Sequence, residues 1–175
     1  MMTPDRPPSR RSALAMKFSH QMTYDAPPAD VQAMLADPAF RAKVCAAMHA
    51  VSHDVDITGS GAGMTVRVEH SRPADGMPSF ARKFVGDQIQ ILQKETWADT
   101  STASLTVEIP GRPGEFNGGI DLAGDDDGTI ETVAGEIKVK IPMLGGKLEG
   151  LIGDLLKKAL TSEQRAGRAW LAGDR

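Results

Sequence analysis

The stretch that decides the fold is residues 145–171, GGKLEGLIGDLLKKALTSEQRAGRAWL. Apolar residues recur there at every third or fourth position, which predicts an amphipathic helix with one apolar stripe: Leu148, Leu151, Ile152, Leu155, Leu156, Ala159 and Leu160. At about 1.5 Å of rise per residue, this helix is about 40 Å long. It therefore needs a broad apolar surface, either a filled core or the wall of a cavity.

The residues before this helix predict that surface. From Val51 to Ile141, apolar and polar residues alternate in six successive segments, separated by turns rich in Gly, Pro and Asp. The connection 71–87 is longer than a hairpin needs, and we expect a short helical turn there that starts near Pro78. Strands joined in series by short turns form an antiparallel meander.

The N-terminal part adds one strand and two short helices. Residues 17–24 alternate like a half-buried strand, whereas residues 29–36 and 38–48 carry apolar residues at helical spacing. Residues 1–15 are rich in Pro, Arg and Ser, which predicts a disordered tail, and Met16 is a second possible translation start. We therefore expect one α+β domain over residues 16–172, in which a curved seven-stranded antiparallel sheet wraps the long C-terminal helix.

The composition excludes several classes of protein. The net charge of −3 argues against a nucleic-acid binder that works by neutralising phosphates. No apolar run approaches the roughly 20 residues of a membrane span, so we expect no stable membrane insertion. The single cysteine, Cys45, cannot form an internal disulfide, which favours a reducing cytoplasm. We expect a cytoplasmic monomer or homodimer.

Four stretches carry a resemblance to a known family: residues 17–20, 78–86 and 91–97, and the final leucine-rich helix. Over about residues 16–172 the chain resembles an uncharacterised actinobacterial family, domain of unknown function 2505, of the START-like or Bet v 1-like (SRPBCC) helix-grip superfamily. The resemblance implies a hydrophobic cavity between the sheet and the C-terminal helix. Because that superfamily includes lipid carriers, hormone receptors and polyketide cyclases, the fold alone does not choose a function.

We expect this cavity to be lined by inward-facing residues of the strands, of the connection near Pro78 and of the last helix: Phe18, His20, Val66, Phe80, Phe84, Ile91, Trp97, Leu105, Phe116, Leu148, Leu151, Ile152 and Leu155. A few polar groups, such as His20, Glu95 or Arg67, would orient a ligand in it. The basic and apolar segment 80–85 is either an amphipathic turn packed on the sheet edge or a lid at the entrance.

Catalytic and cofactor signals are few. His20 and Glu95 are the candidates for a base and an acid, although His20 equally suits a hydrogen-bonded core histidine and strand twist could turn Glu95 to water. The glycine-rich stretch 59–63 lacks the GxGxxG spacing and precedes a strand, so it predicts no dinucleotide site. Neighbours His53 and Asp54 fall on opposite faces of a strand, so we expect no metal and no cofactor.

Three functions fit these features. The first is binding or carriage of a small hydrophobic ligand, lipid-like or polyketide-like, between the sheet and the C-terminal helix. The second is a polyketide cyclase-like enzyme on the same fold. The third is a non-catalytic protein-interaction module with a filled core. What separates them is whether the apolar stripe of residues 148–160 contacts a core or lines a cavity.

Overall fold

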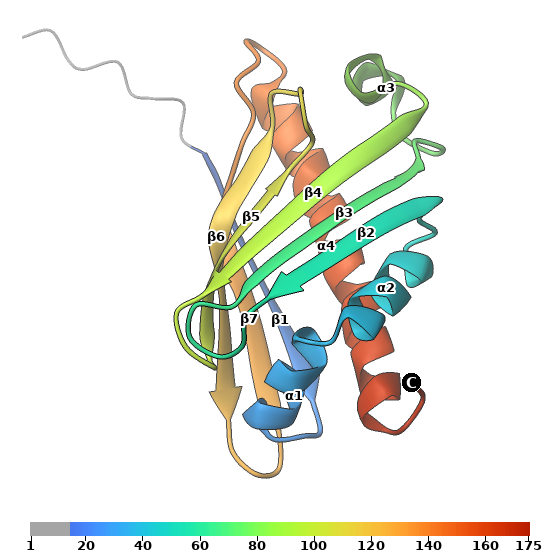
Figure 1. Cartoon of the computed structure of the whole chain (residues 1–175). Helices are drawn as coiled ribbons and strands as arrows, with labels where there is room; N and C mark the ends of the chain where they lie inside the picture. Colours follow the sequence, from blue (N-terminus) through green and yellow to red (C-terminus); the bar gives the residue numbers. More distant parts are fainter. Residues whose placement is uncertain (1–14) are drawn as a thin grey trace, which may run out of the picture.

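One antiparallel sheet holds all the strands, in the spatial order β1-β7-β6-β5-β4-β3-β2 (Figure 1). The computed structural model describes residues 15–175, so the tail predicted for residues 1–15 lies almost wholly outside it. The strands are β1 (Met16–Tyr24), β2 (Ser52–Thr58), β3 (Thr65–Pro73), β4 (Gln88–Trp97), β5 (Thr102–Glu108), β6 (Glu115–Gly124) and β7 (Thr129–Lys138). The helices are α1 (Pro28–Leu35), α2 (Pro38–Ala47), α3 (Ser79–Val85) and α4 (Gly145–Leu171).

The α+β helix-grip fold predicted from the sequence is confirmed. Strands β2 to β7 pair in chain order as a meander. Strand β1 pairs with β7 and forms the edge of the sheet opposite β2, with His20 facing Val133 in the register. The turn expected near Pro78 is α3, which separates β3 from β4. The last strand ends at Lys138, earlier than the alternation to Ile141 indicates, because the next backbone N–H, that of Val139, donates to Glu149 Oε1 of α4 at 3.0 Å.

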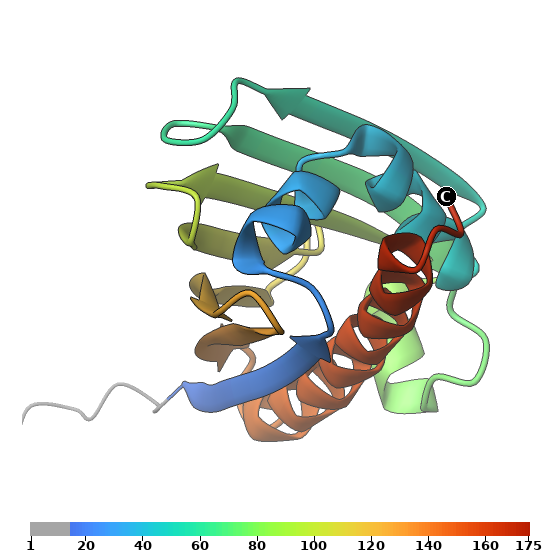
Figure 2. The ribbon, with the colours of Figure 1, turned by 90° about the horizontal axis from the view of Figure 1, so that it is seen from below.

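The sheet curls around α4, which runs along its concave side (Figure 2). Two glycines make part of this curvature possible. Gly118 of β6 and Gly135 of β7 are direct partners in the sheet, and a Cβ built on Gly118 would lie 2.2 Å from the Ala134 carbonyl oxygen. The two backbones therefore approach more closely at this point than side chains would allow.

Two hydrophobic clusters pack between the sheet and the helices. The larger joins α1, α2 and the C-terminal half of α4 to the sheet, and includes an edge-to-face pair of Phe40 and Trp170 with ring centroids 5.5 Å apart. The smaller is built on Ala81, Val139 and Leu148, and it joins α3 to the beginning of α4. The structure places these clusters toward opposite ends of α4.

The long helix is uneven in composition. Four glycines fall within its first nine residues, GGKLEGLIG, whereas its second half carries Ala166, Gly167 and Trp170 buried in the larger cluster. Within residues 15–175, no helix combines the length and the apolar content that a crossing of the bilayer requires.

Candidate functional site

The apolar stripe of α4 is only half-buried over its middle. Leu148 and Leu160 are buried, but the five stripe residues between them are each partly exposed: Leu151, Ile152, Leu155, Leu156 and Ala159. All five line a cavity of about 170 Å³ between α4 and the concave face of the sheet. The middle of the stripe therefore faces open space instead of a filled core.

The walls of the cavity come from six elements besides α4. They are the inner faces of β3, β4 and β5, the start of β6 with the loop before it, α2, and α3, and the lining is predominantly apolar. An engineered cavity of about 150 Å³ with apolar walls binds benzene. The space beneath α4 is therefore large enough to enclose one aromatic ring or a short alkyl chain.

A buried ion pair lies beside the α2 end of this cavity. The Arg41 guanidinium lies on the cavity wall and donates to both carboxylate oxygens of Glu95 at 2.9 Å, and both residues are buried. Gln93 and the Trp97 indole also donate to Glu95, at 2.7 and 2.9 Å, while Arg41 Nε donates to the Leu35 carbonyl at 2.7 Å. Every charged oxygen of Glu95 thus has a donor, and this pair joins α2 to β4.

Two further acids, Glu131 and Glu163, lie near Arg41. Burial raises the pKa of Glu131 well above its usual value, and the charge of Glu163 adds to this shift. Burial also raises the pKa of Glu163, on the cavity wall, to about 7, against the opposing effect of Arg41. The nearby Tyr24 hydroxyl points to Met22 Sδ at 3.8 Å, and burial raises the pKa of Tyr24. The single positive charge of Arg41 is therefore shared by three carboxyl groups. Glu95 forms the ion pair with it, and Glu131 and Glu163 favour their neutral forms.

We expect this cluster to make the protein less stable as the pH rises. Burial raises the pKa of Glu163 from 4.5 to about 7, so the folded protein binds more protons than the unfolded chain over that interval. The stabilisation is complete below the unfolded-state pKa and is lost as pH rises through about 7. Urea unfolding at pH 5 and pH 8 should show a decrease in the free energy of unfolding. Glu163→Gln should remove about 2 kcal/mol of that decrease, while the contribution of Glu131 remains.

A matched control for that measurement lies on the same helix. Asp154 is an exposed acid of α4, so Asp154→Asn removes one negative charge without touching the buried cluster. Its unfolding free energy should keep the pH dependence of the parent protein. A Glu163→Gln variant with the parent's pH dependence would contradict the assignment.

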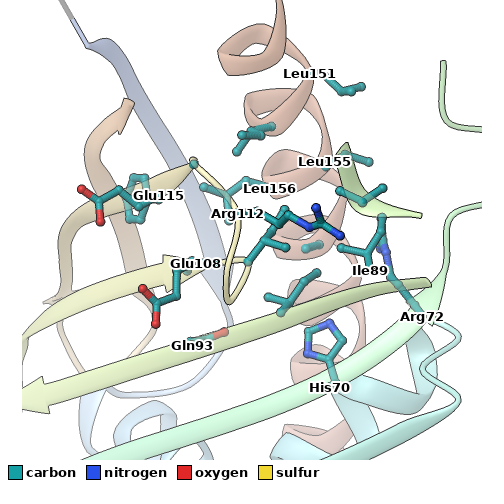
Figure 3. Close-up of a pocket in the computed structure, with 18 of the residues that line it drawn as sticks. His70, Arg72, Ile89, Gln93, Glu108, Arg112, Glu115, Leu151, Leu155 and Leu156 are labelled. Carbon is teal, nitrogen blue, oxygen red and sulfur yellow. The ribbon is translucent and has the colours of Figure 1, made fainter. Parts of the chain in front are cut away.

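The β3 wall of the cavity carries another polar group, His70. Its side chain is buried and lines the cavity, and neither ring nitrogen has a hydrogen-bond partner among residues 15–175 (Figure 3). Burial lowers the pKa of His70, and the positive charge of Arg72 lowers it further. The imidazole is therefore neutral at physiological pH, with one N–H donor and one acceptor nitrogen.

A family profile covers nearly the whole of this domain. The profile of the family described as "Protein of unknown function (DUF2505)" matches residues 19–171. The chain belongs to this family. An uncharacterised protein of Mycobacterium tuberculosis is 30% identical to this DUF2505 chain over 104 residues, which are 56% of this chain and 60% of the mycobacterial protein.

Solved structures show the same fold at low sequence identity. An aromatase/cyclase of Streptomyces sp. R1128 covers 89% of this DUF2505 chain and 93% of its own at 12% identity, with a TM-score of 0.60. A START superfamily protein of Mycobacterium smegmatis, also 12% identical, covers 89% of this chain and 98% of its own with a TM-score of 0.58. The DUF2505 chain therefore has the START-like fold predicted from its sequence.

The structure brings about half of the predicted lining residues together around the cavity. They are Phe84, Ile91, Phe116, Leu148, Leu151, Ile152 and Leu155. The others lie outside it for separate reasons. Val66, Trp97 and Leu105 pack in the larger cluster, Phe80 packs in the smaller one under Lys147 Nζ at 4.3 Å, and Phe18 stacks edge-on against Phe116 with ring centroids 5.9 Å apart.

The predicted polar groups do not lie on the cavity wall. His20 is half-buried on β1, which packs against α4, and burial and Lys157 lower its pKa. Glu95 is saturated by Arg41, Gln93 and Trp97. Arg67 points to the outer face of the sheet, because Val66 and Val68 on either side are buried, and there it pairs with Glu69 and Asp54.

The polar residues that do line the cavity were missed by the sequence reasoning. His70 and Arg72 continue the inward parity of Val66 and Val68 along β3, and this alternation is a signal that could have found them. Arg41 gives no such signal, because its partner Glu95 is 54 residues away in the chain. Over residues 15–175, no group of three or more metal-binding side chains converges.

Proposed function

We propose that this protein binds a small, largely apolar molecule in the cavity between α4 and the sheet. The observation that supports it is the row of half-buried aliphatic side chains on α4, which face about 170 Å³ of open space. Removing apolar surface from water contributes about 25 cal/mol per Å² to the free energy of binding. A ligand that covers these side chains therefore also stabilises the folded protein. The structural neighbours include an aromatase/cyclase and a START superfamily protein, which is consistent with such a site.

The geometry favours binding over the catalytic alternative considered from the sequence. His20 and Glu95, the residues proposed for a base and an acid, do not line the cavity, and both oxygens of Glu95 accept hydrogen bonds from Arg41. The interaction-module alternative supposes a filled core. The half-buried stripe argues against that, because residues that contact a filled core are buried on that face.

The proposal can be tested with n-propylbenzene, an uncharged molecule of one ring and three carbons, by isothermal titration calorimetry. We expect the full chain to bind it. Replacing Ala159, which lines the cavity from the middle of α4, by phenylalanine fills the same space and should weaken binding tenfold or more. The thermal midpoint of Ala159→Phe should not fall, because the added ring occupies open space.

The adjacent residue supplies a matched control. Lys158 is exposed on α4, so Lys158→Phe adds the same ring on the outer side of the helix. That variant should bind n-propylbenzene within twofold of the parent. Absence of binding by the parent, or equal affinities in the two variants, would refute the cavity as the binding site.

A further inference from the structure

The starting point is the unpartnered imidazole of His70. Only 5% of this residue is exposed, and both ring nitrogens lack a hydrogen-bond partner within the described part of the chain, residues 15–175. Buried polar groups in folded proteins are almost always hydrogen-bonded, because losing water without a replacement is costly. The imidazole lines the cavity, so the partner that would satisfy it is a polar atom placed in the cavity.

Arg72 lies two residues further along β3, on the same inward face and on the same cavity wall. Its side chain is half-buried, and burial lowers the pKa of its guanidinium. Among residues 15–175, no carboxylate forms an ion pair with it. A partly desolvated cation without a counter-charge attracts an anion more strongly than a fully hydrated one does.

A second guanidinium faces the same cavity from the other side. Arg112, in the loop between β5 and β6, lines the cavity, and in the part of the chain that the structure describes it has no ion pair either. Figure 3 shows the Arg112 side chain extending into the cavity toward the side from which Arg72 and His70 come. The positive charges of Arg72 and Arg112 therefore lie on the wall of the same cavity.

The acids on the cavity wall do not neutralise these charges. Figure 3 shows the carboxylates of Glu108 and Glu115 pointing away from His70 and Arg72. Glu163 lies beside Arg41, whose own charge is paired with Glu95. The β3 end of the cavity is therefore electropositive and donor-rich, while the stripe of α4 beside it is apolar.

We propose that the ligand of this cavity is an apolar carboxylic acid, bound as its carboxylate. The carboxylate oxygens accept hydrogen bonds from the Arg72 guanidinium and from the N–H of neutral His70, and Arg112 adds a second positive charge. The apolar part of the ligand lies against the half-buried residues of α4. This inference rests on the proposed function, since it names the class of molecule that the same cavity binds.

Three ligands of one skeleton test the assignment by calorimetry at pH 7.5: 3-phenylpropanoate, its methyl ester and n-propylbenzene. A hydrogen bond to a charged group changes affinity by roughly tenfold to a hundredfold. The parent protein should therefore prefer 3-phenylpropanoate to the ester at least tenfold. Arg72→Gln should abolish that preference and leave the affinity for n-propylbenzene within twofold of the parent's. His70→Phe should lower the affinity for 3-phenylpropanoate and for no other ligand of the three.

The same strand offers the control. Arg67→Gln removes an identical charge from the outer face of β3, where Arg67 pairs with Glu69, and it should retain the preference for the carboxylate. Arg72→Lys keeps the charge and should restore part of the preference. The carboxylate assignment is overturned if the parent binds n-propylbenzene but shows no preference for the carboxylate. It is also overturned if Arg67→Gln and Arg72→Gln change that preference equally. In either case the proposal of an apolar binding cavity is unaffected. If the parent does not bind n-propylbenzene, the proposed function itself fails.

Discussion

Replacing Arg41 by methionine should lower the free energy of unfolding by about 3–5 kcal/mol, the usual cost of removing one partner of a buried ion pair. The variant leaves the buried Glu95 without its cation. Glu131 and Glu163 also lose the positive charge of Arg41, which opposes the rise in their pKa values. The variant also leaves the Leu35 carbonyl without its donor. Urea unfolding followed by circular dichroism at pH 7 measures the loss.

The double variant Arg41→Met, Glu95→Gln separates the unpaired charge from the lost packing. Glutamine keeps a side-chain oxygen for the Trp97 indole but carries no charge. It should therefore recover about 2 kcal/mol relative to Arg41→Met alone. If the unfolding free energy of Arg41→Met alone were within about 1 kcal/mol of the parent's, the ion pair would contribute no more to stability than an exposed ion pair does.

Gly118→Ala should destabilise the protein by about 3 kcal/mol, because the new methyl group meets backbone and not a movable side chain. The added carbon would lie 2.2 Å from the Ala134 carbonyl oxygen and 2.8 Å from Gly135 Cα, so β6 and β7 must separate where the sheet bends. Gly135→Ala should behave alike, since its Cβ would lie 2.3 Å from the Asn117 carbonyl oxygen. Thermal unfolding by calorimetry measures both variants.

The control is Gly114, immediately before β6. A Cβ there would lie 3.4 Å from side-chain carbons of Ile152 and Val139, which is ordinary contact. Gly114→Ala should therefore stay within about 1 kcal/mol of the parent. If Gly118→Ala were equally mild, the close approach of β6 and β7 would not be needed for the curvature of the sheet.

The periodic elements of this fold could be predicted because one face of each is buried. The stripe of α4 predicted a helix over residues 145–171, which are the bounds that the structure shows, and the alternation between Val51 and Ile141 predicted the six strands β2 to β7. Such patterns report which face is apolar. They do not report whether the apolar face meets other side chains, so Leu155 in the cavity and Leu160 in the larger cluster look the same in the sequence.

The polar part of the site was harder to predict, because it depends on pairings between distant segments. Glu95 has the parity of an inward residue and is inward, but only the position of α2 decides that Arg41 neutralises it. His70 has the same inward parity and meets no such partner within residues 15–175. Parity therefore indicates which residues face inward, and tertiary pairing decides which of them remain available to a ligand.

The glycines at the start of α4 have a consequence for local stability. A glycine in a helix interior costs up to about 1 kcal/mol relative to alanine, and two of these four glycines, Gly150 and Gly153, lie beyond the first turn of α4. The C-terminal half of α4 is instead fixed to α2 by Trp170 and Phe40. We therefore expect the first turns of α4 and the neighbouring α3 to open at a lower free energy than the whole domain, and hydrogen exchange should detect their amide hydrogens first.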